Sequence, residues 1–178
     1  AQSFNAEVDQ AKEFNPDAVA VIGFEESAKI LSRMHEVGIG PSDGMLVYGT
    51  DGNMGNALGE SVATGLLAGM KGTTPLTAIG PDFENRLKAA DPALIDFNYA
   101  GESYDAVVIT ALAAEQAKST AGVDIAANII SVTRDGVKCN TFADCRDRII
   151  AGEDIDYDGV TGELAFGPAG EPSVGSYG

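Results

Sequence analysis

Two short apolar runs, each ending at a glycine, constrain the fold most strongly. Residues 18–22 read Ala-Val-Ala-Val-Ile before Gly23, and residues 45–48 read Met-Leu-Val-Tyr before Gly49. Runs this short, apolar throughout and rich in β-branched residues, are typical of strands that are buried on both faces of a parallel sheet. Because helical segments alternate with them, we expect an α/β fold: a parallel sheet flanked by helices, with right-handed crossovers.

Helical periodicity is clear in several further segments. Apolar residues recur at helical spacing over residues 4–14, behind Ser3 as a candidate N-cap, and over residues 25–37, before Gly38 as a candidate C-cap. Residues 65–70 are a candidate third strand, although their start also suits a helix end. Later helices are expected to form a section without strands, at residues 82–90, 103–118, 124–132 and 141–150.

The end of the chain changes character again. Residues 164–166 and 173–177 have the pattern of two strands, and the segment Gly-Pro-Ala-Gly between them contains turn residues. We therefore predict a C-terminal β-hairpin.

Charge and hydropathy exclude two classes of partner. The chain of 178 residues has 11 Lys and Arg against 27 Asp and Glu, a net charge of −16. A field of this sign repels phosphate backbones, so we expect no nucleic-acid binding. The longest apolar runs, such as residues 106–114, are shorter than the roughly 20 residues that a membrane-spanning helix needs.

No set of residues assembles a metal site or a reaction. Residues 154–159 read Asp-Ile-Asp-Tyr-Asp-Gly and begin like an EF-hand loop, but Ala165 stands where such a loop needs its bidentate Glu, which favours a solvated acidic turn. The glycines over residues 49–59 lack the Lys-Ser/Thr of a phosphate loop, and the single histidine, His35, has no nucleophile motif with it. We predict no catalytic residues, no metal and no cofactor.

The two cysteines, Cys139 and Cys145, are six positions apart. This spacing is neither a redox C-x-x-C motif nor a zinc motif. A disulfide, which indicates a location outside the cytoplasm, and two free thiols both remain open on the residues alone.

Candidate binding residues follow the two predicted strands. Gly23, Phe24 and Glu25 come after the first strand, and Thr50 and Asp51 come after the second. Open α/β sheets bind ligands at the carboxyl ends of their strands, so an aromatic ring and a carboxylate are expected to face one crevice there. This pair suits a small cationic or zwitterionic ligand. The alternative is that the Asp-Gly pair is simply a turn or a helix cap.

The order of four segments makes the sequence similar to the second half of a known family. It resembles the type I periplasmic-type solute-binding proteins of ABC transporters, in the branch that binds leucine, isoleucine and valine. The segments are residues 4–23, residues 45–52 ending in Gly-Thr-Asp-Gly, residues 104–115 beginning Tyr-Asp-Ala-Val, and residues 156–166 beginning Asp-Tyr-Asp-Gly. In that family two lobes close over the ligand and deliver it to a membrane permease.

The resemblance implies roles for the parts of the chain. Residues 1–78 would be the second, ligand-binding lobe, residues 79–152 a helical section of the opposite lobe, and residues 153–178 a hairpin returning to the first. Asp51 matches the acidic position that holds a ligand's ammonium group, and Phe24 matches an aromatic position beside it. Asp51 stands where a longer acid is common.

The resemblance also implies location and partners. A pair such as Cys139 and Cys145 is frequent in similar sequences, which favours a disulfide and export to the periplasm or the cell surface, with or without a lipid anchor. The family's amino-terminal half is absent, so we expect a fragment that self-associates or pairs with a separate amino-terminal lobe. The expected function is extracytoplasmic binding of an amino acid or similar molecule; the alternative is a ligand-sensing domain of a receptor or regulator.

Overall fold

The structure, a computed structural model, describes residues 3–75, 78–172, 175 and 177–178. Its contacts divide these residues into two units. The first unit holds the described residues up to Pro75 together with Tyr177–Gly178, and the second holds those from Ala78 to Gly175. Among the described residues, no helix has both the length and the apolar character that crossing a membrane requires.

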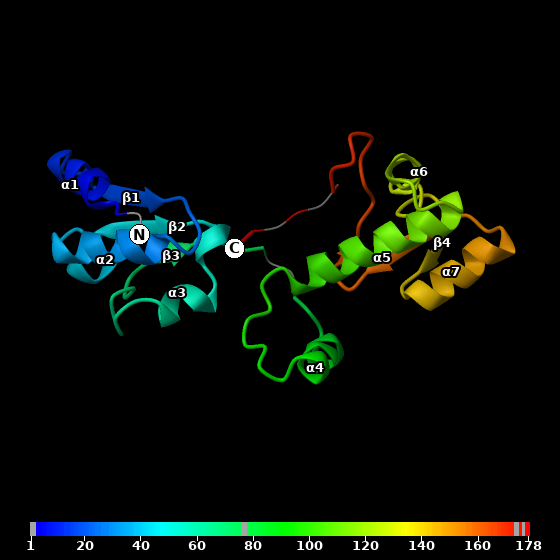
Figure 1. Cartoon of the computed structure of the whole chain (residues 1–178), viewed down its shortest axis with the longest axis horizontal. Helices are drawn as coiled ribbons and strands as arrows, with labels where there is room; N and C mark the ends of the chain where they lie inside the picture. Colours follow the sequence, from blue (N-terminus) through cyan, green and yellow to red (C-terminus); the bar gives the residue numbers. More distant parts are fainter. Residues whose placement is uncertain (1–2, 76–77, 173–174, 176) are drawn as a thin grey trace. The chain divides into compact units, whose positions relative to one another are not determined.

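The first unit contains a parallel sheet of three strands in the order β1 (Ala18–Val21), β2 (Leu46–Gly49) and β3 (Lys71–Gly72). The connections between the strands carry helices (Figure 1). The expectation of an α/β fold with parallel strands is confirmed. The helical elements of this unit are α1 (Asn5–Glu13), α2 (Ser27–Glu36), α3 (Asn56–Glu60) and the 3-10 helices η1 (Pro41–Asp43) and η2 (Asp51–Asn53).

Helix α2 shows how the sequence builds this core. Ala28, Leu31 and Met34 recur at helical spacing and are buried, together with Val21 and Val47 of the sheet. The helix ends as expected at Gly38, which has a φ of 77°. The N–H of Gly38 donates to His35 O at 3.0 Å, and the N–H of Ile39 donates to Met34 O at 2.9 Å, so the last carbonyls of the helix are satisfied.

The second unit combines helices with a small mixed sheet. Strand β4 (Val137–Cys139) pairs in parallel with β5 (Ile155–Gly159), which pairs antiparallel with β6 (Gly162–Glu163). The helices are α4 (Pro81–Ala90), α5 (Ala100–Ala117), α6 (Gly122–Asn128) and α7 (Phe142–Ala151). The long helix α5 packs against α6 and α7 and contacts β5.

Two predictions about strands were wrong in position. Residues 65–70 are not a strand, because Gly65 and Gly69 have φ values of 85° and 88° and turn the chain; the third strand follows them as β3. The section predicted to be helical throughout contains β4. Three residues are too few to show a periodicity that sequence reasoning can detect.

The C-terminal hairpin is present, but it forms earlier than expected. Its strands are β5 and β6, and Gly162, the first residue of β6, has a φ of 99°. Residues 164–166 are not a strand, since Ala165 has a φ of 32°, outside the extended region. Residues 173, 174 and 176 of the second predicted strand lie outside the described residues. Which lobe of a binding protein each unit represents stays a prediction.

Candidate functional site

The two predicted binding loops leave the sheet next to each other. Strands β1 and β2 are parallel neighbours, with Val21 opposite Gly49, so the chain continues from adjacent carboxyl ends into both loops. A Cβ atom built on Gly52 would lie 2.8 Å from Gly23 O and 2.8 Å from Phe24 Cε1. The loop after β2 therefore packs directly against the loop after β1, at a distance that only glycine allows.

A cavity of about 310 Å³ lies beside this contact, within the first unit. Of the five candidate binding residues, Phe24 and Glu25 line it. Gly23 and Asp51 are next in the chain to lining residues, whereas Thr50 lies two positions before the lining residue Gly52. Asp51 is half-buried and is the first residue of η2. Phe24 is 70% exposed and therefore does not belong to the core of this unit. The full lining is Phe24, Glu25, Gly52, Asn53, Gly55, Ala57, Leu58 and Ser61.

The loop after β1 is held by Glu26. Its carboxylate accepts the N–H of Phe24 at 3.0 Å, and this hydrogen bond lowers the pKa of Glu26 below its ordinary value. A Cβ on Gly23 would meet Glu26 Oε1 at 2.8 Å and Ser27 Oγ at 2.9 Å, so a larger residue there would displace these two side chains. The backbone of Phe24 is thus fixed at the entrance to α2 while its ring stays exposed.

Asn53 joins the two loops, and sequence reasoning missed it. Its side chain is buried, donates from Nδ2 to Val21 O at 2.8 Å and to Ser27 Oγ at 3.0 Å, and accepts the N–H of Thr50 at 2.9 Å. The available signal was its place three residues after Thr50, the spacing of a capping box. One amide therefore ties the end of β1, the start of α2 and the start of η2 together.

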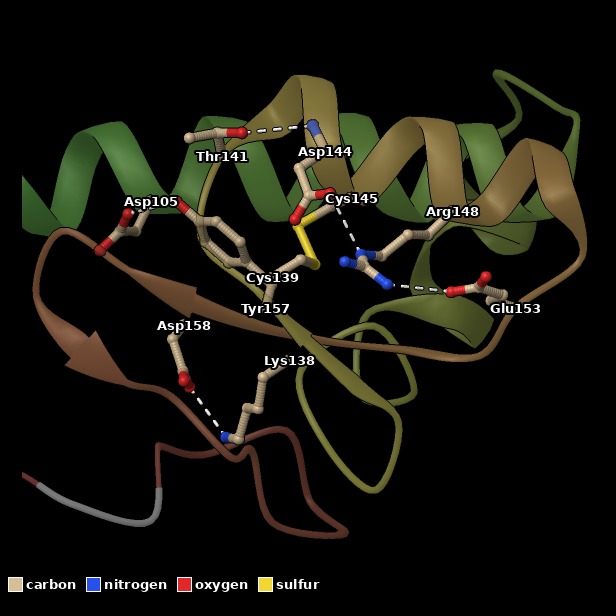
Figure 2. Close-up of a disulfide and its surroundings, with 10 residues drawn as sticks. All are labelled: Asp105, Lys138, Cys139, Thr141, Asp144, Cys145, Arg148, Glu153, Tyr157 and Asp158. Carbon is tan, nitrogen blue, oxygen red and sulfur yellow. Dashed lines mark hydrogen bonds and ion pairs between the residues drawn. A yellow bond between two sulfur atoms is a disulfide. The ribbon is translucent and has the colours of Figure 1, made fainter.

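In the second unit, the cysteines form a disulfide, as the resemblance implied. Cys139 of β4 and Cys145 of α7 are bonded, with Cα atoms 5.4 Å apart, and both are buried (Figure 2). Helix α7 begins between them, where Thr141 Oγ1 accepts the N–H of Asp144 at 3.2 Å. The disulfide therefore fixes the start of this helix to the sheet.

The acidic segment after residue 153 forms strand β5 and not a calcium loop. Asp156 and Asp158 lie on the same side of β5, and Lys138 of the neighbouring strand β4 contacts both carboxylates at 2.9 Å. These contacts raise the pKa of the Lys138 ammonium group, through the hydrogen bond to Asp158 first and that to Asp156 second. No group of three or more His, Cys, Asp or Glu residues is placed to hold a metal ion in the described part of the chain.

Solved structures resemble this chain along most of its length, whereas no protein-family model and no curated protein sequence matches it. A leucine-binding protein, LivK, from Thermotoga maritima is 20% identical with a TM-score of 0.67. LivJ from Streptococcus pneumoniae, a branched-chain amino acid transporter substrate-binding protein in complex with isoleucine, is 18% identical with a TM-score of 0.63. A type 1 periplasmic binding protein from Bordetella pertussis is 25% identical with a TM-score of 0.60.

The matches to LivK and LivJ cover almost all of this chain, and all three matches cover less than half of the neighbour. LivK is matched over 99% of this chain and 44% of its own, and LivJ over 98% and 44%. The Bordetella protein is matched over 75% and 39%. At this level of identity the likeness shows the fold and not the ligand. The chain therefore has the fold of part of a type I periplasmic solute-binding protein, which confirms the resemblance found in its sequence.

Proposed function

We propose that the chain binds an amino acid or a similar small molecule at the carboxyl ends of β1 and β2, as the solute-binding component of an ABC transporter. The observation that carries this proposal is the cavity beside Gly52, lined by Phe24 and Glu25. It lies where open α/β sheets place their ligands. The fold shared with LivK and LivJ supports a binding function rather than catalysis.

Each candidate residue has a role in this proposal. The exposed Phe24 ring packs on the ligand's apolar part, and the Asp51 carboxylate accepts hydrogen bonds from its ammonium group. Gly23 and Thr50 place the backbone of the two loops, and Glu25 adds a second carboxylate to the cavity wall.

The proposed partners and location follow from the same fold. A permease receives the ligand, and the protein acts outside the cytoplasm, in the periplasm or at the cell surface. The buried disulfide supports an oxidising compartment. We also propose that a second copy, or a chain matching the rest of LivK, completes the binding cleft. Light scattering at micromolar concentration tests this association, and a clean monomer contradicts self-association.

Substitution of Asp51 tests the binding function. Asp51→Asn removes a charge-assisted hydrogen bond and should weaken an ammonium-bearing amino acid by about tenfold to a hundredfold. Asp17→Asn, at the exposed amino-terminal end of β1, is the matched control and should leave affinity unchanged. Mass spectrometry of molecules that copurify with the native protein identifies the ligand for calorimetry. Equal affinity of Asp51→Asn and the unmodified protein would remove Asp51 from the site.

A further inference from the structure

The charge of the cavity points to a more specific ligand class, and this inference rests on the proposed function. Among the described residues that line the cavity, Glu25 is the one with an ionisable side chain. The other lining residues are apolar or neutral, and Asp51 adjoins the lining through Gly52. The wall therefore offers a negative charge without a lysine, arginine or histidine beside it in the lining.

Glu25 and its neighbour Glu26 differ in what they do. Glu26 turns back and accepts the N–H of Phe24, which gives it a structural role in the turn. For the Glu25 carboxylate, the described residues provide no hydrogen bond or ion pair, although the side chain lines the cavity. An uncharged ligand that covers Glu25 displaces the water bound to its carboxylate and provides no positive charge in return. The cost of this desolvation weakens binding.

The residue before Glu25 strengthens the preference for a cation. Phe24 presents an exposed aromatic ring to the same cavity. An aromatic ring beside a carboxylate suits ammonium and guanidinium groups, because the cation gains both a cation–π interaction and an ion pair. An aliphatic side chain uses the ring but leaves the carboxylate without a partner.

From this arrangement we infer that the ligand is an amino acid with a basic side chain, whose second positive group contacts Glu25 and Phe24 while its α-ammonium group contacts Asp51. Two loops thus divide the two cationic groups between them: the loop after β1 takes the side chain and the loop after β2 takes the α-ammonium group. The cavity of about 310 Å³ admits a molecule of this size.

Titration of the full chain with L-lysine and L-leucine, followed by ¹⁵N–¹H NMR, tests the inference. Lysine should bind about fivefold more tightly than leucine, as expected for one partly exposed ion pair. Glu25→Gln should remove this difference, because lysine loses its ion pair and leucine no longer covers an unpaired carboxylate. Glu13→Gln at the exposed end of α1 makes the same change in net charge away from the cavity and should alter neither.

The outcomes separate this inference from the proposed function. Leucine binding as tightly as lysine, or a Glu25→Gln variant that keeps the preference for lysine, overturns the inference and leaves the binding function standing. If neither amino acid shifts any resonance of the chain, the inference is overturned, and the proposed function is decided separately by the ligand that copurifies with the native protein. Loss of lysine's advantage in Glu25→Gln but not in Glu13→Gln supports both.

Discussion

The phenolic hydroxyl of Tyr157 donates a hydrogen bond of 2.8 Å to Oδ1 of Asp105, across 52 positions of the sequence (Figure 2). The same carboxylate accepts the N–H of Val160 at 3.0 Å, the N–H of Thr161 at 2.9 Å and the hydroxyl of Thr161 at 2.6 Å. Asp105 is 1% exposed. One buried carboxylate of α5 therefore holds the turn between β5 and β6. This contact connects residues 104–115 with residues 156–166, two of the four segments on which the family resemblance rests.

Asp105→Asn should destabilise the second unit by about 2–4 kcal/mol. The amide keeps one acceptor oxygen but places an NH₂ group against donors, so buried N–H and O–H groups lose their partner. Urea unfolding followed by circular dichroism measures the loss. Asp147→Asn, which removes an exposed ion pair with Arg146, is the control and should change the unfolding free energy by less than about 0.5 kcal/mol. Equal midpoints for the two variants would contradict the role of Asp105.

Stability should also fall at alkaline pH because of Tyr157. Burial, and then the hydrogen bond to Asp105, raise the pKa of this phenol above its ordinary value of 10.0. Because the pKa is higher in the folded than in the unfolded state, the protonated phenol contributes fully to the unfolding free energy below pH 10. This contribution is lost as the pH rises above 10. We expect the unfolding free energy to drop by about 1 kcal/mol more between pH 9 and 11 than in Tyr157→Phe. If the unfolding free energies of the unmodified protein and of Tyr157→Phe fell equally with pH, the role of Tyr157 would be contradicted.

Much of the fold was predictable because periodicity and turn residues agreed locally. The helix ending at Gly38 and a strand over residues 18–21 are both observed, since each has an apolar pattern and a glycine stop. The expectation that the first two strands are buried on both faces was wrong, because exposed and buried residues alternate along β2 and Ile22 is exposed. Strand β4 was not predictable, because three residues carry no pattern and its partner β5 is distant in the sequence. The Asp105 contacts were equally hidden, as nothing local shows that a helical aspartate faces a turn more than 50 residues away.

At the candidate site, the sequence located the loops but not all of their contacts. The rule that parallel strands end at one edge was enough to place Phe24 and Glu25 in one region with the loop after β2. It did not identify Asn53, because an amide that bonds the backbone of another loop leaves no periodic signal. The sequence analysis also named Asp51 as a binding residue, whereas Gly52 is the residue that lines the cavity. A charged side chain is recognisable in a sequence, but a close approach between two backbones is not.

Reduction should destabilise the second unit without unfolding the first. Breaking the Cys139–Cys145 bond increases the intact mass by about 2 Da and releases a short loop, which costs roughly 2 kcal/mol in the chain-entropy estimate. Intact mass with and without reductant checks the bond, and thermal unfolding checks the energy. The Cys139→Ser, Cys145→Ser double variant should match the reduced protein. An unchanged mass under denaturing reduction would show that the thiols are free.

Asn53→Ala should loosen the two candidate binding loops, after β1 and after β2, together. The change removes a buried amide that serves Val21 O, Ser27 Oγ and the N–H of Thr50, and we expect a loss of about 2–3 kcal/mol in the first unit. Amide hydrogen exchange at Thr50 should become faster, in proportion to this loss of stability. Asn5→Ala in the exposed part of α1 is the control and should leave this exchange unchanged. Slow exchange at Thr50 in Asn53→Ala would contradict the role of Asn53.

A pair of glycine substitutions tests the contact between the loops. In Gly52→Ala the new methyl group would lie 2.8 Å from Gly23 O and from Phe24 Cε1, so the ring must move and the backbone of the loop must shift. We expect a loss of about 1–3 kcal/mol and altered ring resonances of Phe24 in NMR spectra. Gly59→Ala, in α3, meets nothing within 4 Å and should be neutral or stabilising by about 0.5–1 kcal/mol. Because both variants add the same methyl group, equal stabilities would show that the loop after β2 does not pack on Phe24.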